Sequence, residues 1–347
     1  MTAGESEARG RRLDAPHRRS RARREAAPTA RRPSVRHLGT RLVERIAVTA
    51  YRLAAWTLRH VPETVGVAVL ATAFQAAYVF WPQKRASSNA NFAHVLGRPA
   101  DDPAVRRLAL AAYRTYARYL VELMRLPIGR DGGYADRVDL EGIEPVLERW
   151  RSSGRGLILT VGHLGSNEAV AAGIAHHGFP IGVVADDSAF PELFDLLRRQ
   201  REAWGLSIIP WRNLRELFGF LRRNEILGLL VDWGYREDGI PVRLFGAWTC
   251  LPAGPAVLAA KTGTPIVPIA VRRDGRRFRV EAGAAIEVGS PAPAELQRAT
   301  QSVADALERA IAAAPEQWYS FRTIWPATEA ESEVLERRAV EMLAQPG

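Results

Sequence analysis

The sequence predicts an α/β fold in which helices flank a mostly parallel central sheet, preceded by an N-terminal helical region. Short apolar runs of strand length begin only after residue 138, and helix-like stretches separate most of them. Before residue 138, apolar side chains recur at helical spacing. Strands that alternate with helices are typical of a parallel sheet covered on both faces.

Residues 1–36 are rich in Arg, Ala, Pro and Ser, and we expect them to form a disordered tail. Residues 1–60 contain 15 Arg, no Lys and five acids, whereas the rest of the chain balances 33 basic against 33 acidic side chains. A nucleic-acid enzyme usually carries basic surface on its folded domain, so no nucleic-acid partner is expected. A basic segment beside an apolar one suits an anionic membrane surface, although a solvated tail fits the same composition. No apolar stretch closely follows the first Arg residues, so we expect no signal peptide.

Residues 37–81 are expected to form membrane-associated helices. Residues 38–60 have the pattern of a basic amphipathic helix, which Pro62 ends. Residues 64–80 contain no charged side chain and lie at the lower limit of length for a membrane span. The sequence leaves open whether this stretch spans a membrane, lies in its interface or packs on the core.

Residues 82–326 are expected to form the catalytic domain. A polar connector with a short helix precedes a helix over residues 101–126, which Asp102 caps and Pro103 begins. The expected strands are residues 157–161, 181–185, 206–210, 226–232 and 265–271, with closing strands at 277–282 and 285–288. The expected helices are residues 168–177, 190–204, 213–223, 253–262 and 293–313, and a last helix near 327–344 lies in a C-terminal segment, residues 327–347.

Several kinds of site are excluded by what the chain lacks. Cys250 is the single cysteine, so neither an internal disulfide nor a cysteine-based zinc site can form. The sequence contains no HExxH and no GxSxG motif, so we expect no metal site and no serine nucleophile of the elbow type.

The stretch LILTVGHLGSNE, residues 157–168, carries the candidate chemistry. It predicts a strand that ends in a glycine-containing turn, with His163 in the turn and Glu168 in the first turn of the next helix. On a continuous helix, five residues would place the two side chains about 140° apart. We therefore expect a bend at Gly165, across which Glu168 accepts a hydrogen bond from one ring nitrogen and leaves the other as a base.

Such a base would deprotonate a substrate hydroxyl, which would then attack a thioester carbonyl. General base catalysis contributes roughly 10²–10⁴-fold to a rate. The backbone amides of Gly162 and Gly165 are the candidate oxyanion donors. The alternative is a packed histidine and a helix-capping glutamate. None of the other six histidines has a paired acid in a strand-to-helix turn.

The motif HLGSNE resembles the H-x4-D/E motif of the lysophospholipid acyltransferase superfamily. The chain is most similar to the branch of lipid A biosynthesis lauroyl/myristoyl acyltransferases and phosphatidylinositol mannoside acyltransferases. Further blocks of the branch follow in order over about residues 81–326. They are Asn91-Phe92, the blocks at 231–236 and 242–246, the Pro-Gly-Pro helix with its strand at 251–268, and the segment 315–326.

The resemblance implies a glycerolipid-acyltransferase-like fold and an acyl-carrier-protein or coenzyme A thioester as donor, with no other cofactor. It implies transfer to a hydroxyl of a glycolipid or lysophospholipid, by an enzyme that is peripheral or singly anchored at the cytoplasmic face of the bacterial inner membrane. Asp186 and Asp232 match charged positions of the branch. Arg236 and Arg243 would pair with a donor or acceptor phosphate. Solvated surface charges are the alternative for all four. The branch usually has Asn-Trp before the motif acid, where this chain has Ser166-Asn167.

Two other functions of the domain remain open from the sequence, and nucleic-acid binding through the Arg-rich tail is a third class of alternative. An acyl thioesterase would use the same residues with water in place of the lipid hydroxyl. A non-catalytic membrane-binding protein would keep the fold alone. The sequence does not identify the acceptor lipid, the acyl chain length or the donor carrier.

Overall fold

A computed structural model describes residues 35–126, 135–185 and 190–345 of the 347-residue chain. Residues 43–347 form one compact unit and residues 1–42 a second, and each is considered by itself. The tail predicted at residues 1–36 therefore lies almost entirely outside the described residues. The predicted boundaries within residues 43–347 stay a prediction.

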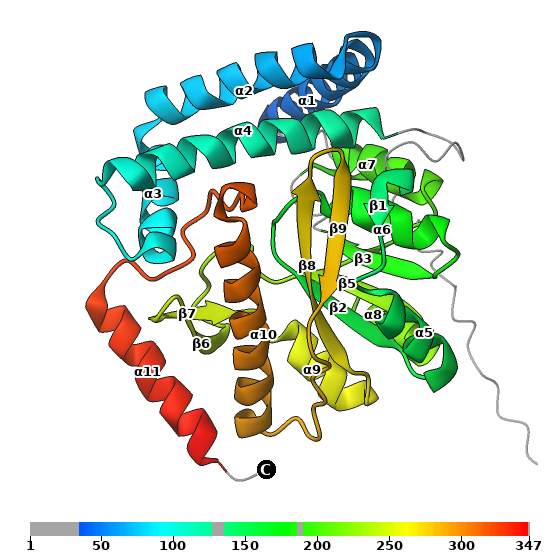
Figure 1. The fold of residues 1–347 in the computed structure, drawn as a ribbon, viewed down its shortest axis with the longest axis vertical. Coiled ribbons are helices and arrows are strands. Elements are labelled where there is room, and N and C mark those ends of the chain that lie inside the picture. The colour runs from blue at the N-terminus through cyan, green and yellow to red at the C-terminus, as the bar shows by residue number, and fades with distance from the viewer. Residues whose placement is uncertain (1–34, 127–134, 186–189, 346–347) are drawn as a thin grey trace, which may run out of the picture. The chain divides into compact units, whose positions relative to one another are not determined.

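The centre of the compact unit is a seven-stranded sheet with the order β1-β9-β8-β2-β5-β3-β4 (Figure 1). Strands β8, β2, β5, β3 and β4 run parallel to one another, while β9 is antiparallel to β8 and β1 is parallel to β9. This arrangement confirms the predicted mostly parallel sheet. The strands are β1 (Val138–Asp139), β2 (Leu157–Val161), β3 (Ile181–Ala185), β4 (Ser207–Pro210), β5 (Ile226–Leu230), β8 (Ile266–Asp274) and β9 (Arg277–Ala282).

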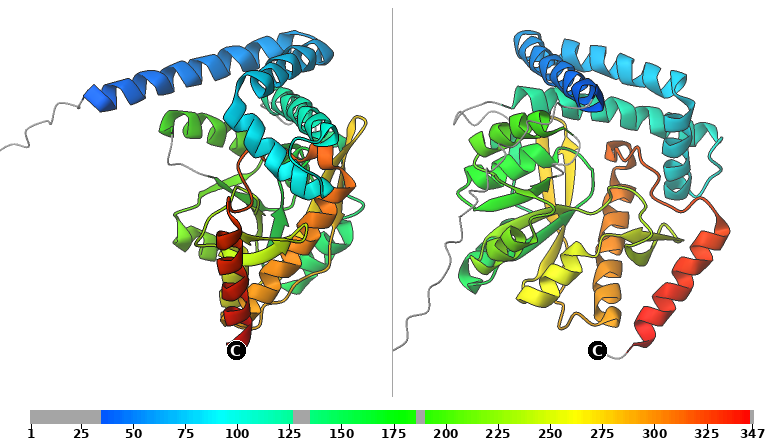
Figure 2. Two further views of the ribbon diagram at one scale, coloured as in Figure 1. Left: turned by 90° about the vertical axis from the view of Figure 1, so that its left-hand side faces the viewer. Right: turned by 180° about the vertical axis from the view of Figure 1, so that it is seen from behind.

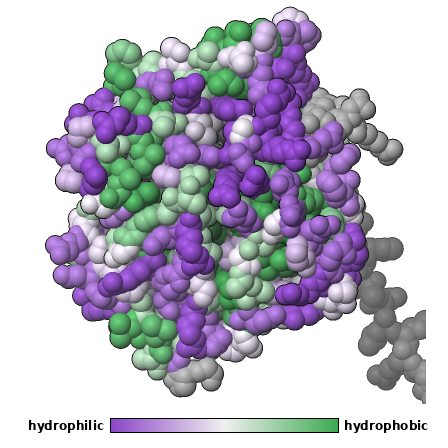
Figure 3. Space-filling model, viewed as in Figure 1, coloured by the Kyte–Doolittle hydropathy of each residue, from purple (hydrophilic) through white to green (hydrophobic). Residues whose placement is uncertain are grey.

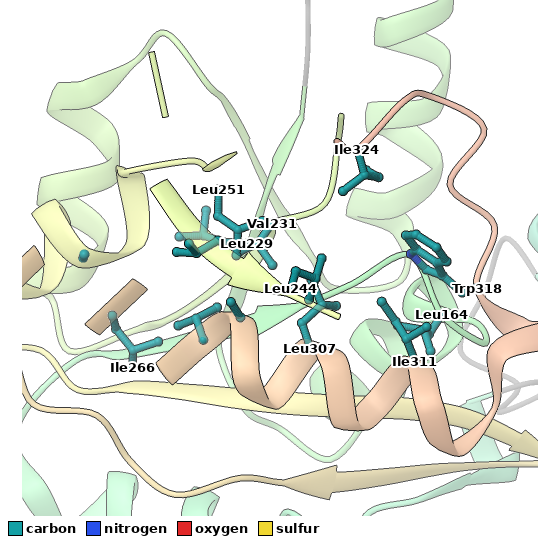
Figure 4. Close-up of a cluster of buried hydrophobic side chains, with 14 of the residues drawn as sticks. Leu164, Leu229, Val231, Leu244, Leu251, Ile266, Leu307, Ile311, Trp318 and Ile324 are labelled. Carbon is teal, nitrogen blue, oxygen red and sulfur yellow. The ribbon is translucent and has the colours of Figure 1, made fainter. Parts of the chain in front are cut away.

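Helices cover both faces of this sheet because its strands are apolar on both sides. In β2, Ile158 faces one buried cluster while Leu157 and Leu159 face the other. The first cluster lies under α8 (Leu214–Arg222), α9 (Gly254–Thr262) and α10 (Pro293–Ala313). The second lies under α5 (Glu144–Ser153), α6 (Asn167–His176) and the end of α7 (Pro191–Ala203). Figure 4 shows part of the first cluster, with Leu307 and Ile311 of α10 near Leu164 and Trp318.

Four helices precede the sheet: α1 (Val35–His60), α2 (Glu63–Phe80), α3 (Pro82–Leu96) and α4 (Pro103–Arg125). Helix α2 packs along α4, and α4 crosses the sheet at the β8–β9 turn, where Arg118 donates to the Gly275 carbonyl (Figures 1 and 2). Gly66 of α2 permits the close approach of α1, because a Cβ there would lie 2.7 Å from the side chain of Leu58. The helical region and its place beside the carboxyl ends of the parallel strands are thus set by contacts within one unit.

Helix α2 is, within the described residues, long and apolar enough to cross a membrane, and only 17% of it is buried. Hydrophobic side chains reach the surface over this end of the molecule among hydrophilic ones (Figure 3). The large exposed apolar residues of α1, α2 and their junction with α3 are Val43, Ile46, Leu53, Trp56, Val65, Val69, Val79, Phe80 and Trp81.

The structure also contains elements that sequence analysis missed. These are the short 3-10 helix η1 (Ala135–Arg137), β1, α5, the 3-10 helix η2 (Pro315–Gln317), and a separate antiparallel hairpin of β6 (Ile240–Leu244) and β7 (Ala247–Leu251). Its two-residue turn holds Phe245 at φ 50° and Gly246 at φ 74°. Phenylalanine rarely adopts a positive φ, and the usual sequence of such a turn is Asn-Gly. The sequence Phe-Gly therefore did not predict a hairpin. A carboxylate oxygen of Glu308 accepts the Phe245 N–H and helps to hold the turn.

One expected strand is wrong. Residues 285–288 form a single bridge, between Ile286 and Ile266, on the edge of β8 that precedes its pairing with β9. The ladder does not extend, because Pro268, the next residue of β8 that faces this edge, has no N–H to donate. The last helix, α11 (Glu329–Ala344), begins two residues later than predicted. Thr328 and Glu331 form a capping box that sets its start.

Candidate active site

The candidate site forms where β2 ends and α6 begins. Gly162, His163 and Leu164 make the bend, and Gly165, at φ 59°, lets the chain pass against the Val271 carbonyl. A Cβ on Gly165 would lie 2.8 Å from that oxygen, so a glycine is required there. The predicted bend at Gly165 is therefore confirmed.

Asp232 reaches this bend because β5 lies beside β2. The two strands pair in parallel from Leu157 with Ile226 to Val161 with Leu230, and the Val231 N–H extends the ladder to the Val161 carbonyl at 3.1 Å. The next residue along the chain is Asp232, which consequently lies next to the Gly162–His163 peptide.

Asp232 is a buried carboxylate that accepts three hydrogen bonds. Its Oδ1 lies 2.6 Å from Nδ1 of His163, and its Oδ2 accepts the His163 backbone N–H at 2.9 Å. The indole N–H of Trp318 donates to Oδ2 at 2.8 Å. The Asp232 side chain is fully buried, and that of His163 is 17% exposed. The carboxylate is therefore fixed in position and fixes the imidazole in turn.

The two groups shift each other's pKa in opposite directions. Burial alone would lower the pKa of His163, but the Asp232 carboxylate raises it above 6.5. Burial would raise the pKa of Asp232, but His163 and the other hydrogen-bond donors lower it below 3.8. Because Asp232 is ionised and only accepts, Nδ1 of His163 carries the donated proton. Among the described residues, Nε2 of the imidazole has no hydrogen-bond partner.

The segment after η2 supports the bend from the other side. The backbone N–H of Tyr319 donates to the His163 carbonyl at 3.0 Å, and the Gly165 N–H donates to the Gln317 carbonyl at 3.2 Å. The Tyr319 hydroxyl donates to the Gly165 carbonyl at 3.2 Å. Since its N–H is already bonded, Gly165 is not free to stabilise an oxyanion in this structure. The oxyanion role of Gly162 stays a prediction.

The structure does not form the expected hydrogen bond between His163 and Glu168. Both carboxylate oxygens of Glu168 instead accept from Nε of Arg201, at 3.1 and 3.0 Å. Arg201 comes from α7, and the side chains of the pair are 12% and 18% exposed. Glu168 is the second residue of α6, so its carboxylate faces the neighbouring helix, while Asp232 occupies the ring nitrogen. The carboxylate that orients the imidazole is therefore Asp232.

The other predicted residues lie as follows. Asp186 lies outside the described residues. Arg236 forms an ion pair with Asp238 at 2.7 Å, and both side chains are more than 60% exposed. Arg243, in β6, lies 3.4 Å from Glu336 of α11 and over the Trp248 ring. A substrate-binding role for these residues stays a prediction.

Sequence analysis missed Trp318 and Arg201. Trp318 follows η2, 86 residues from Asp232 along the chain, and no local pattern marks its indole N–H as a donor to a carboxylate. Arg201 stands in a run of charged helical residues, where nothing distinguishes it from its exposed neighbours.

A cavity of about 260 Å³ adjoins the bend on the α10 side of the sheet. The end of β2 and Gly162 line it together with apolar side chains of α10, among them Leu307 and Ala310. Arg272, Glu281 and Arg309 also line it. No group of three or more His, Cys, Asp or Glu side chains able to hold a metal occurs in the part of the chain that the structure describes.

Comparisons with known proteins show what the chain is similar to. The family model described as bacterial lipid A biosynthesis acyltransferase matches residues 32–326. A phosphatidylinositol mannoside acyltransferase of Mycolicibacterium smegmatis is 29% identical over 258 residues, which cover 72% of this chain and 81% of the relative. The protein of the same name from Mycobacterium tuberculosis is 27% identical over 252 residues, which cover 70% and 77%.

Proposed function

Because the chain belongs to the bacterial lipid A biosynthesis acyltransferase family and is an acyltransferase, we propose that it moves a fatty acyl group onto a phosphatidylinositol mannoside or a related glycolipid. The names of the relatives support this acceptor. The donor in this proposal is an acyl thioester of acyl carrier protein or coenzyme A, since a base without a covalent nucleophile needs an already activated acyl group.

The proposed mechanism uses His163 as a general base oriented by Asp232. Nε2 of His163 takes the proton of the acceptor hydroxyl as its oxygen attacks the thioester carbonyl carbon. The tetrahedral intermediate then collapses, the C–S bond breaks, and the imidazolium returns the proton to the leaving sulfur. The products are the ester and the free thiol. The observation that carries the proposal is the 2.6 Å contact of Nδ1 with Asp232, which leaves Nε2 available.

Glu168 has a positioning role in this proposal. Its ion pair with Arg201 joins the first turn of α6 to α7. The residue before Arg201, Gln200, connects α7 to α1, because the Tyr51 hydroxyl donates to Gln200 Oε1 at 2.8 Å. Loss of Glu168 would therefore disturb the bend that holds His163 without removing the base.

The exposed apolar residues of α1 and α2 support attachment to a membrane surface. Arg45 and Arg52 of α1 would face anionic headgroups while Leu53 and Trp56 enter the interface. In this proposal the enzyme is peripheral, or anchored by α2, at the cytoplasmic face, where acyl carrier protein and coenzyme A thioesters are made.

The cavity beside Gly162 is the proposed site for the acyl chain. The small side chains Ala306 and Ala310 leave room along α10. An Ala310→Trp variant should lose activity with long-chain donors more than with short-chain donors. An equal loss with both donors would show that the acyl chain does not lie in this cavity.

The function is tested with purified wild type, His163→Ala, Glu168→Gln and a control, His176→Ala. His176 lies at the end of α6, the helix that contains Glu168, and its side chain is 45% exposed. Each protein is incubated with palmitoyl-coenzyme A, with and without phosphatidylinositol mannoside in detergent micelles, and the products are measured by mass spectrometry. Wild type and His176→Ala should form acylated lipid, and His163→Ala should not. Full transfer by His163→Ala would end the proposal, and equal release of free palmitate without acceptor would show a thioesterase.

A further inference from the structure

Arg322 carries a guanidinium beside the base that the mechanism does not use. Its Cζ lies 4.4 Å from the centre of the Trp233 ring. The centre of the same ring lies 5.5 Å from that of the His163 imidazole. Trp233 is 51% exposed and Arg322 is also exposed, so both face solvent at the mouth of the site. Within the described residues, Arg322 forms no ion pair.

The fold holds this arginine in position from α3. The amide nitrogen of Asn91, a buried residue, donates to the carbonyls of Ser320 and Arg322 at 3.1 and 2.7 Å. Its oxygen accepts the N–H of Ile324 at 3.1 Å. Three hydrogen bonds from one side chain thus fix the backbone on both sides of Arg322.

The loop after Asp232 also holds the backbone beside this arginine. The Tyr235 N–H donates to the Thr323 carbonyl at 2.8 Å. Gly234, at φ 131°, lies against Arg322, and a Cβ on this glycine would lie 3.2 Å from Cβ of the arginine. The loop that supplies Asp232 to the base therefore also places Trp233 under the guanidinium.

The contrast with Arg201 shows what this arrangement can do. The Arg201 guanidinium is occupied by Glu168, and its side chain is 18% exposed. The Arg322 guanidinium is held by an aromatic face, which attracts a cation, and its N–H donors have no hydrogen-bond acceptor among the described side chains. A guanidinium with free donors binds a phosphate through charge-assisted and often paired hydrogen bonds.

We propose that Arg322, supported by Trp233, binds a substrate phosphate beside His163. This inference rests on the proposed function, in which both substrates carry a phosphate. One is the phosphodiester of the lipid headgroup, and the other is the phosphate of the pantetheine arm of the donor. Binding of the headgroup phosphate would place an acceptor hydroxyl near Nε2, and binding of the pantetheine phosphate would hold the donor at the mouth of the site.

The experiment compares wild type, Arg322→Gln, Arg322→Lys and a control, Arg337→Gln, whose side chain on α11 is 63% exposed. The donor arm pairs palmitoyl-coenzyme A with palmitoyl-N-acetylcysteamine, which has no phosphate. The acceptor arm pairs phosphatidylinositol mannoside with octyl mannoside, which also has none. kcat/KM is measured for every combination.

Arg322→Gln should lower kcat/KM by roughly tenfold or more for the phosphate-bearing partner of one arm and leave the phosphate-free partner almost unchanged. The arm that responds identifies the source of the phosphate. Arg322→Lys should keep part of the preference, and Arg337→Gln all of it. Activity with the phosphate-free substrates shows that each variant is folded.

An equal change, or no change, for phosphate-bearing and phosphate-free substrates in both arms would overturn the inference. Absence of transfer by wild type with every combination would instead reject the proposed function. A pH profile adds a second readout, because the charge of Arg322 lowers the pKa of His163. The acidic limb of kcat/KM should therefore move to higher pH in Arg322→Gln. A limb at the same pH as in wild type would show that the charge of Arg322 does not act on His163.

Discussion

Asp232 and Glu122 are both fully buried carboxylates, yet their pKa values shift in opposite directions. The pKa of Asp232 is lowered, because His163 and three hydrogen bonds outweigh its burial. Burial raises the pKa of Glu122 to about 7, although Arg273 and Arg118 act against the rise and Glu63 adds to it. One oxygen of Glu122 lies 3.3 Å from Nε of Arg118 without a hydrogen bond.

The difference teaches that burial alone does not decide the charge of a carboxyl group. Donors aimed at both oxygens keep Asp232 ionised, as a residue that orients a base must be. Glu122, on α4, joins the helical region to the sheet through Arg273 of β8 and is partly protonated near neutral pH. The environment of Asp232 suits catalysis, and the environment of Glu122 makes the stability of the fold depend on pH.

Asp232→Asn should give the largest effect. An amide cannot match the charge that orients the imidazole, so kcat should fall by roughly 10²–10⁴-fold while the fold is retained. Initial rates and circular dichroism of the purified variant check this. A rate within tenfold of wild type would mean that the pair with His163 is only structural.

Glu122→Gln should change how stability depends on pH. A group whose folded pKa is raised contributes stability below its unfolded pKa of 4.5 and loses it as pH rises through about 7. Denaturant unfolding at pH 5 and pH 8 should therefore show a decline in wild type that is smaller in Glu122→Gln by roughly 3 kcal/mol. Parallel declines in the two proteins would contradict the raised pKa.

The pH dependence of activity should show the effect of the Asp232 charge on the pKa of His163. Transfer needs neutral His163, so kcat/KM should rise with pH through a pKa above 6.5. In Asp232→Asn the carboxylate no longer raises that pKa and burial lowers it, so the remaining activity should rise at lower pH. An acidic limb at the same pH in both proteins would show that another group titrates.

Glu148→Gln should give the smallest effect and serves as the exposed counterpart of Glu122→Gln. Glu148 pairs with Arg151 at 2.8 Å on α5, and both side chains are about half exposed. Such surface pairs contribute little, so the free energy of unfolding should change by less than about 0.5 kcal/mol at either pH. A pH-dependent change as large as that of Glu122→Gln would mean that loss of any carboxylate produces it.

Much of the frame could be predicted from local pattern. The bounds of β2, β3, β9 and α10 agree with those expected, because apolar runs, Gly and Pro positions and helical periodicity act over a few residues. The hairpin β6–β7 was missed because Phe245 occupies a turn position that Asn or Gly normally takes.

Local sequence was also sufficient to locate His163 at the end of a strand and to require a bend at Gly165, because both follow from chain geometry over a few residues. It could not select the partner of His163. Asp232 is 69 residues away and arrives through the pairing of β5 with β2, while Glu168, five residues away, turns to Arg201 on a neighbouring helix. Hydrogen bonds form between groups that are close in space, and that closeness depends on strand order and register, which no short stretch of sequence encodes.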